Sequence, residues 1–166
     1  MNCNATERPR TIVLCLGNEL LADDAIGIRA AEILAERMSQ VVSVVASSQS
    51  GLALLEVLAG YDRAIIVDAI QTGKRPPGQI QRLTPSDLKD TYAPSPHYAG
   101  LPEMFAIAKH LQLRFPTRID LVAVEVKDTS TLGGEITAEV RSSLGAVVDE
   151  VESILAKTHP ERPYDA

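Results

Sequence analysis

Residues 11–27 place an apolar segment, a short polar loop and an amphipathic segment in direct succession. Residues 11–16 are predicted to form a buried strand, and apolar side chains recur at helical spacing over 24–38. A strand followed directly by a helix begins a βαβ unit, which restricts the folds open to the chain. The loop between them ends in two adjacent acids, Asp23 and Asp24. Because ligands of open α/β sheets bind beyond the carboxyl ends of strands, this pair is a candidate site.

The rest of the chain continues this alternation with one interruption. The further predicted elements are strands at 41–46, 63–67 and 118–126, and helices at 52–59, 102–113 and 137–156. Residues 72–78 are rich in turn-forming residues and too short for a crossover helix, so 79–83 is predicted as an antiparallel or edge strand. The predicted fold class is α/β: a three-layer α/β/α sandwich around a mostly parallel sheet of about five strands.

Length and composition fit a single domain. The chain has 166 residues, of which 45% are hydrophobic, and its longest apolar runs are far shorter than a membrane span requires. We expect a flexible leader at 1–10, one catalytic domain at 11–158 and a loose tail at 159–166. The leader is polar and lacks an apolar signal core, so a cytoplasmic protein is expected. We also expect the protein to be a monomer.

The net charge of the chain indicates which kinds of partner it can bind. The formal net charge of −6 argues against a general nucleic-acid or anionic-membrane binder, because those surfaces attract clustered Lys and Arg. A basic protein surface or a cation fits better. The two cysteines, Cys3 and Cys15, lack the spacing of a zinc or redox motif, and Cys15 is expected to be a small core residue.

Three segments are predicted to bring polar side chains to one edge of the sheet. They supply the acidic pair, Asp68 directly after the strand 63–67, and His97 within a Pro-rich loop. Two carboxylates and an imidazole would suit nickel, zinc or manganese and are too oxygen-poor for a calcium cage. With three protein ligands such a site keeps open positions for water, a substrate carbonyl or ligands from a partner.

Each of these residues also has an ordinary structural interpretation. Asp23 is a typical helix N-cap, Asp68 could satisfy backbone N–H groups of a turn, and His97 could be merely exposed. His110 and His159 are assigned no role, since they fall at a helix end and in a polar tail. Only the spatial arrangement can separate the alternatives.

Three motifs together resemble the hydrogenase maturation endopeptidases, which process the large subunit of nickel-iron hydrogenases. The motifs are Gly17-Asn18-x-Leu-x-x-Asp23-Asp24-x-x-Gly27, the Asp68-Ala69 pair after a strand, and Ser-Pro-His97-x-x-Gly-Leu. The similarity extends over nearly the whole chain and implies an α/β/α sandwich. In the family the second acid of the pair, the Asp of the third strand and the loop His bind a metal ion, which implies Asp24, Asp68 and His97 as catalytic metal ligands here.

The resemblance also implies an activity. It predicts an endopeptidase that removes the C-terminal extension of a hydrogenase large-subunit precursor, with nickel in the precursor as the recognition element and other divalent ions able to occupy the site. Asp23 would orient the loop or act as a base. Two alternatives stay open: a non-catalytic metal-binding module, and a Mg²⁺-dependent phospho-receiver-like domain that would use Lys127.

Overall fold

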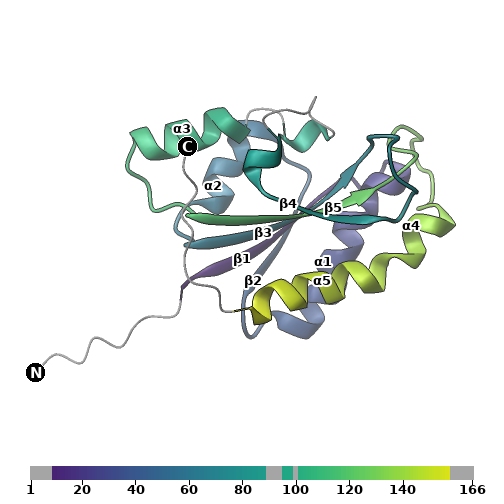
Figure 1. The fold of residues 1–166 in the computed structure, drawn as a ribbon, viewed down its shortest axis with the longest axis horizontal. Coiled ribbons are helices and arrows are strands. Elements are labelled where there is room, and N and C mark those ends of the chain that lie inside the picture. Colours follow the sequence, from purple (N-terminus) through teal and green to yellow (C-terminus); the bar gives the residue numbers. More distant parts are fainter. Residues whose placement is uncertain (1–8, 89–94, 99–100, 158–166) are drawn as a thin grey trace, which may run out of the picture.

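The computed structural model describes residues 9–88, 95–98 and 101–157 (Figure 1). Most of the predicted leader and the whole tail 159–166 lie outside these residues, as do 89–94 and 99–100 of the loop around His97. The strands are β1 (Thr11–Leu16), β2 (Ser43–Ser47), β3 (Arg63–Ile70), β4 (Ile80–Leu83) and β5 (Arg118–Glu125). The α-helices are α1 (Ile26–Met38), α2 (Leu54–Leu58), α3 (Leu101–His110), α4 (Ala138–Ser142) and α5 (Leu144–Ala156). Short 3-10 turns are η1 (Ala22–Ala25), η2 (Gly51–Ala53), η3 (Pro85–Leu88) and η4 (Pro96–Tyr98).

The described strands form one sheet in the order β2-β1-β3-β5-β4. The pairs β1–β2, β1–β3 and β3–β5 are parallel, and β4 runs antiparallel to β5 at one edge. The predicted fold class is therefore confirmed, including the antiparallel edge strand. Parallel pairing turns the carboxyl ends of β1, β2, β3 and β5 toward the same edge, where the polar loops lie.

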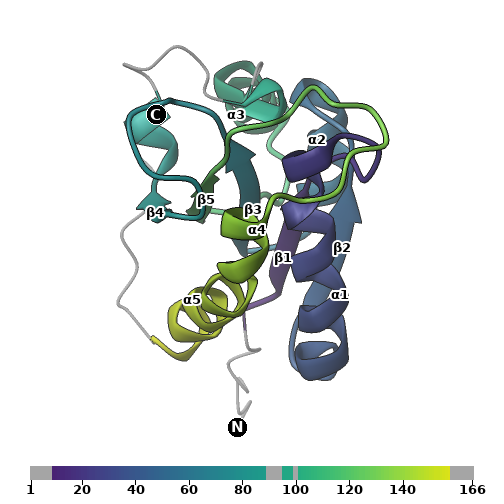
Figure 2. The same ribbon diagram turned by 90° about the vertical axis from the view of Figure 1, so that its right-hand side faces the viewer.

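Helices cover both faces of the sheet (Figures 1 and 2). One face packs against α1 and α5, and the other packs against α2 and α3. Because β1 and β3 are covered on both sides, their side chains are buried almost without interruption, which explains their continuous apolar sequence. Gly27 lets α1 approach β1, since a Cβ atom there would collide with the carbonyl oxygen of Leu16.

The third strand is longer than predicted. Asp68 was expected directly after a strand ending at Val67, but β3 continues to Ile70, in register with Val124 and Glu125 of β5. Asp68 therefore belongs to the strand and pairs in register with Ala123. The parallel ladder to β5 fixes its backbone, so its carboxylate is held by the sheet rather than by a turn.

Several element boundaries differ from the prediction, and for three of them the structure gives a local reason. The acidic pair lies in the 3-10 turn η1, and α1 begins only at Ile26. β2 begins at Ser43 because the N–H groups of Val41 and Val42 still donate to the Met38 carbonyl at the end of α1. The predicted final helix is two helices separated at Ser143, whose hydroxyl donates to the carbonyl of Val140.

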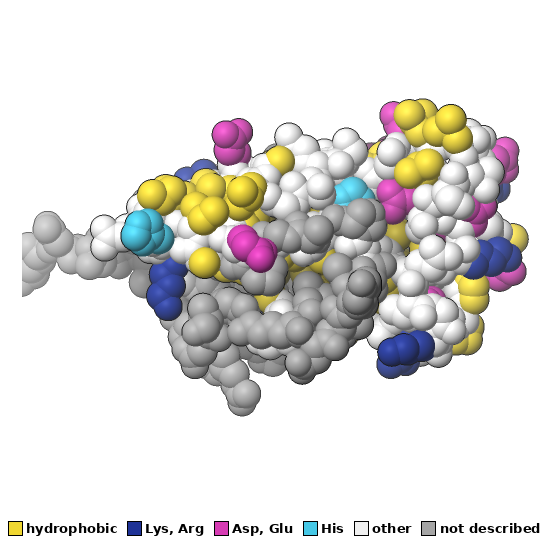
Figure 3. Space-filling model, turned by 90° about the horizontal axis from the view of Figure 1, so that it is seen from above, with side chains coloured by type: hydrophobic (Ala, Val, Ile, Leu, Met, Phe, Trp, Pro, Cys, Tyr) yellow, Lys and Arg dark blue, Asp and Glu magenta, His cyan; other side chains and the backbone are white. Residues whose placement is uncertain are grey.

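In the part of the chain that the structure describes, the surface visible in Figure 3 shows no large cluster of basic side chains, as the net negative charge of the chain leads one to expect. In Figure 3 the basic side chains of the visible face are scattered, with acidic and apolar side chains between them. Among the described residues no helix combines the length and apolar character needed to cross a bilayer.

Candidate functional site

The structure brings the three predicted ligand residues together, although they come from distant parts of the chain. Asp24 lies in η1, Asp68 in β3 and His97 in η4, and one potential ligand atom from each lies within 4.8 Å of the others. All three side chains are buried, with residue exposures of 4%, 0% and 5%. We call this trio the metal-ligand cluster.

His97 is oriented by a backbone carbonyl. Its Nδ1 lies 3.0 Å from the carbonyl oxygen of Gln49, in the loop after β2. A carbonyl only accepts hydrogen bonds, so Nδ1 carries a proton and Nε2 of the neutral ring presents its lone pair. Nε2 lies 3.7 Å from an Asp24 carboxylate oxygen and has no hydrogen-bond partner among the described residues. This is the usual arrangement of a metal-binding histidine, with one nitrogen anchored and the other free.

Asp68 is a buried carboxylate whose two oxygens accept no hydrogen bond of ordinary geometry from the described residues, although Ser95 and the backbone of Ala69 lie near enough to lower its pKa. Burial raises its pKa to about 7, although the neighbouring His97 acts in the opposite direction. An unpaired buried carboxylate is costly, and a bound cation would remove that cost. The unpaired oxygens of Asp68 and Nε2 of His97 therefore fit a metal ion, by the position and the chemistry of the donors.

Without a cation, the cluster is well suited to holding a proton. Burial disfavours the charged imidazole, but the nearby Asp24 carboxylate, the charge of Asp68 and the Gln49 carbonyl together raise the pKa of His97 to about 9. A divalent cation must displace this proton to bind Nε2. The same residues can therefore exchange protons for metal at neutral pH.

Asp23, directly before Asp24, makes contacts that hold neighbouring backbone segments in place. Its carboxylate is fully buried and accepts hydrogen bonds from the backbone N–H groups of Lys127, Asp128 and Thr137 at 3.2, 3.1 and 2.7 Å. It thereby ties the segment between β5 and α4 to η1. Asp23 was expected either to orient the loop or to act as a base, and these contacts fit the first role. Both of its carboxylate oxygens already accept hydrogen bonds from backbone N–H groups.

The loop after β1 has the conformation that its residues predict. Gly17 packs so closely on the turn that a Cβ atom there would collide with the Asp24 carbonyl oxygen. The side chain of Asn18 accepts from the N–H of Leu20 at 3.0 Å, as an Asx turn does. Both residues therefore shape the path of the chain to Asp24.

Two contributors to the site could not be identified from side-chain patterns. Gln49 acts through its backbone carbonyl, which carries no sequence signal. Tyr98 follows His97 and is buried, and its hydroxyl has no hydrogen-bond partner among the described residues. Burial, together with the nearby charge of Asp68, raises the pKa of Tyr98 well above its usual value, so the hydroxyl stays protonated beside the cluster.

Other residues considered from the sequence lie away from the cluster. Lys127 pairs with Glu139 at 2.8 Å on an exposed part of the surface, so its ammonium has a partner other than the cluster acids. Cys15 is buried in β1, and burial raises its pKa to about 12, as expected for a core residue. His110 lies exposed at the end of α3, and His159 falls outside the described residues.

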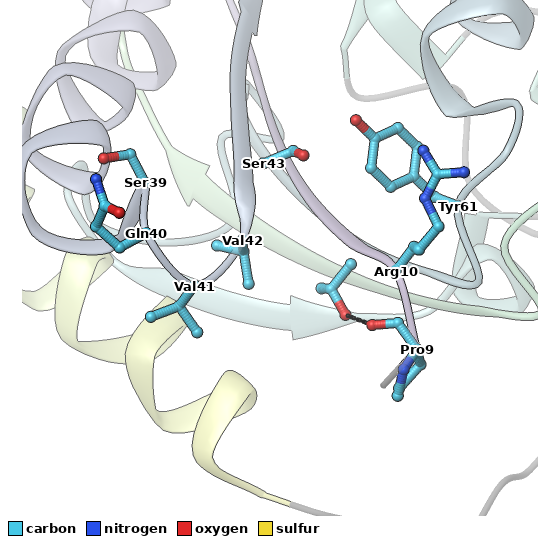
Figure 4. Close-up of a pocket in the computed structure, with 9 residues that line it drawn as sticks. Pro9, Arg10, Ser39, Gln40, Val41, Val42, Ser43 and Tyr61 are labelled. Atoms are coloured by element: carbon cyan, nitrogen blue, oxygen red, sulfur yellow. Dashed lines mark hydrogen bonds between the residues drawn. The ribbon is translucent and has the colours of Figure 1, made fainter. Parts of the chain in front are cut away.

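A hollow of about 370 Å³ lies at the other end of the strands (Figure 4). It is lined by the start of β1, the segment 39–43 and Tyr61, over whose ring the guanidinium of Arg10 lies at 5.5 Å. None of the three cluster residues lines it. The cluster at the carboxyl edge of the sheet and this hollow are therefore separate features of the molecule.

The arrangement at the carboxyl edge can bind a divalent ion through two carboxylates and one imidazole. Three protein ligands leave coordination positions open to a substrate. An ion held there could be presented to a peptide bond and would supply Lewis-acid chemistry to it. The protein supplies a cluster that is fixed on three sides by a strand, a 3-10 turn and a backbone carbonyl.

Comparisons with known proteins agree with this geometry. The family model described as hydrogenase maturation protease matches residues 5–154. The hydrogenase 2 maturation protease of Escherichia coli K12 is 30% identical, over 92% of this chain and 94% of that protein. The hydrogenase expression/formation protein HupD of Rhizobium leguminosarum bv. viciae is 32% identical, over 89% of this chain and 74% of that protein.

Solved structures give the same result. The hydrogenase maturating endopeptidase HybD from E. coli superimposes with a TM-score of 0.74 at 30% identity, covering 88% of this chain and 91% of that one. The NiFe hydrogenase maturation protease HybD from Thermococcus kodakarensis has a TM-score of 0.66 at 30% identity, covering 89% and 99% of the two chains. The fold, the cluster and these matches together show that this chain is a peptidase of the hydrogenase maturation protease family.

Proposed function

We propose that this peptidase removes the C-terminal extension of a nickel-loaded hydrogenase large-subunit precursor, and that Asp24, Asp68 and His97 recognise the nickel held by that precursor. The observation that carries the proposal is the incomplete bonding of the cluster. Both oxygens of Asp68 and Nε2 of His97 are buried without a partner among the described residues. A cation delivered by the substrate would complete these bonds only when the correct precursor is docked.

The roles of the residues follow from their positions. The cluster would bind the nickel from one side while the precursor keeps its own ligands on the other, which fixes the precursor against the carboxyl edge of the sheet. Hydrolysis adds water across the peptide C–N bond, giving a carboxylate on the mature subunit and an amine on the released extension. Gln49 would hold His97 in the tautomer that faces the ion, and Asp23 would hold the adjoining loop. The proposal includes a monomeric enzyme that acts in the cytoplasm.

The test is the intact mass of hydrogenase large-subunit precursors after incubation with this protein. Nickel-loaded and nickel-free precursors are each treated with wild type, Asp24→Asn and Asp149→Asn. Asp149 is a matched control, since it is an exposed acid on α5. We expect a single C-terminal loss with nickel-loaded precursor, for wild type and Asp149→Asn only.

Three outcomes would overturn parts of the proposal. Full cleavage by Asp24→Asn would remove Asp24 from the required ligands. No mass loss with any verified nickel-loaded precursor would exclude cleavage of this substrate and favour a metal-binding module without catalysis. Cleavage that is independent of nickel would overturn the recognition role of the ion.

A further inference from the structure

The two edge strands of the sheet differ in how they are protected. β4 is short, lies between Pro77 and Pro85, and carries the charged Arg82. Prolines and charges of this kind keep an edge strand from pairing with another chain. β2, at the opposite edge, has the sequence Ser-Val-Val-Ala-Ser and carries neither. Figure 2 shows β2 at the outer side of the sheet, with α1 over one face.

The segment that contains β2 is also free of charge over a long stretch. No Asp, Glu, Lys or Arg occurs from Ser39 to Leu55, in a chain where 23% of residues are charged. Its strand residues are half-buried or exposed, whereas those of the central strands are buried. The segment therefore has the composition that favours β pairing, and it lacks the prolines and charges that protect β4.

Hydrogen bonding shows which backbone groups of β2 are free. The N–H of Gly17 donates to the Ser47 carbonyl at 3.1 Å, so the backbone of Ser47 faces β1. Alternation along a strand then turns the N–H and C=O groups of Val44 and Ala46 away from β1. Among the described residues β2 pairs with β1 alone, so these groups face no other strand.

The free edge is continuous with the metal-ligand cluster. β2 ends at Ser47, and Gln49, two residues later, supplies the carbonyl that orients His97. Gly17, which bonds to Ser47, begins the loop that leads to Asp24. An extended chain lying along β2 would therefore arrive at the cluster at one of its ends.

We propose that the free edge of β2 binds the C-terminal extension of the precursor as an added antiparallel strand. This inference rests on the proposed function. The extension follows the scissile bond, so a chain cut at the cluster and bound to β2 must run from the cluster back toward Ser43, which is antiparallel to β2. Two of its residues, spaced two apart, would exchange backbone hydrogen bonds with Val44 and Ala46. Recognition of this part of the substrate is thus largely independent of its side chains.

The first experiment compares Ala46→Pro with Ile80→Pro in precursor processing. Proline at 46 removes an outward N–H, which edge strands tolerate, and leaves the bonds to β1 in place. Ile80 is the matched control, because its N–H points away from β5 in the same way on β4. For Ala46→Pro we expect KM to rise roughly tenfold with little change in kcat, as loss of a substrate hydrogen bond predicts. Ile80→Pro should leave KM unchanged.

A second experiment needs no variant of the protein. Synthetic peptides with the sequence of the extension are N-methylated at one residue at a time and tested as inhibitors of processing by the wild-type enzyme. Methylation should weaken inhibition at alternate residues and have little effect at the residues between them. The pattern reports strand pairing directly, so it decides the question even if Ala46→Pro fails to fold.

The outcomes separate this inference from the proposed function. Absence of cleavage by wild type would overturn the proposed function and this inference with it. Normal cleavage with an unchanged KM for folded Ala46→Pro, or inhibition without a two-residue alternation, would overturn β2 docking alone.

Discussion

Two buried aspartates on neighbouring strands, Asp68 and Asp120, differ in the partners that surround their carboxylates and in the direction in which their pKa values are shifted. Asp68 of β3 has an exposure of 0% and accepts no hydrogen bond from the described residues. Asp120 of β5 has an exposure of 6% and is surrounded by the guanidinium groups of Arg82, Arg118 and Arg63 at 2.7, 3.2 and 3.5 Å. Burial raises the pKa of Asp68 to about 7, whereas for Asp120 the arginines outweigh burial and lower the pKa.

The difference separates a carboxylate that holds strands together from one that we propose to be a metal ligand. The partners of Asp120 come from β3, β4 and β5, so its bonds hold strands together. Asp68 lies at the other end of β3, close to Asp24 and His97, and its oxygens lack such partners. A buried carboxylate without partners costs stability, and the proposed binding of a cation there would offset that cost.

The largest expected effect is on activity. We expect Asp68→Asn to lower the processing rate on the order of 100-fold, because an amide is a weaker ligand and has no charge to offer a cation. The rate is measured by the mass shift of nickel-loaded precursor. Asp120→Asn is the control, and its folded fraction should retain the wild-type rate. Similar rate losses in both variants would contradict the distinction between the two aspartates.

The second prediction concerns stability. Asp120→Asn should lower the free energy of unfolding by about 3 kcal/mol, because three buried or half-buried arginines lose their shared carboxylate. The pKa of Asp120 is lower in the folded than in the unfolded protein, so its contribution is present above about pH 4 and lost as the pH falls through the folded value. Urea titrations at pH 7 and pH 3 would show the difference between wild type and variant shrinking in acid.

The third prediction concerns metal binding by the free protein. Because the pKa of His97 is raised to about 9 and that of Asp68 to about 7, a divalent ion must displace protons from the cluster. Affinity for nickel should therefore increase with pH, by about tenfold per unit between pH 7 and pH 9. Calorimetric titration in buffers of different ionisation enthalpy would measure both affinity and proton release. An affinity that does not vary over this range would show that the cluster is already deprotonated.

The sequence was sufficient to predict the fold class and the proximity of the three cluster residues, because both depend on patterns along the chain, whereas their role as metal ligands stays a prediction. Alternating apolar segments indicated the layers, and Asp24, Asp68 and His97 each fell at the end of an apolar segment or in a loop. The sequence could not distinguish Asp23 from Asp24 by physics alone, since adjacent residues differ only in the direction of their side chains. The position of Asp68 inside β3 was also missed, because pairing with β5 extended the strand through Ala69 and Ile70.

A fourth prediction reverses the usual effect of a core substitution. The pKa of Asp68 is higher in the folded protein than the unfolded value near 3.8, so wild type loses stability as the pH rises from 4 to 7. Asp68→Asn removes this loss, and in the absence of metal it should be more stable than wild type at pH 8, by at least about 1 kcal/mol. At pH 4 the two proteins should unfold at the same urea concentration. A variant less stable than wild type at pH 8 would show that the Asp68 carboxylate is paired in solution.

The smallest effect should come from an exposed ion pair of the same chemistry as that of Asp120. Arg37 of α1 and Glu152 of α5 lie 3.3 Å apart, with side-chain exposures of 53% and 38%. Water screens this pair, so Glu152→Gln should change the free energy of unfolding by about 0.5 kcal/mol or less. Glu152→Gln and Asp120→Asn are compared in the same urea titrations. Both variants remove a carboxylate that pairs with arginine, and the two sites differ in how deeply the pair is buried. A loss at Glu152 as large as at Asp120 would mean that ion pairing itself, rather than the burial of an unpaired charge, sets the cost.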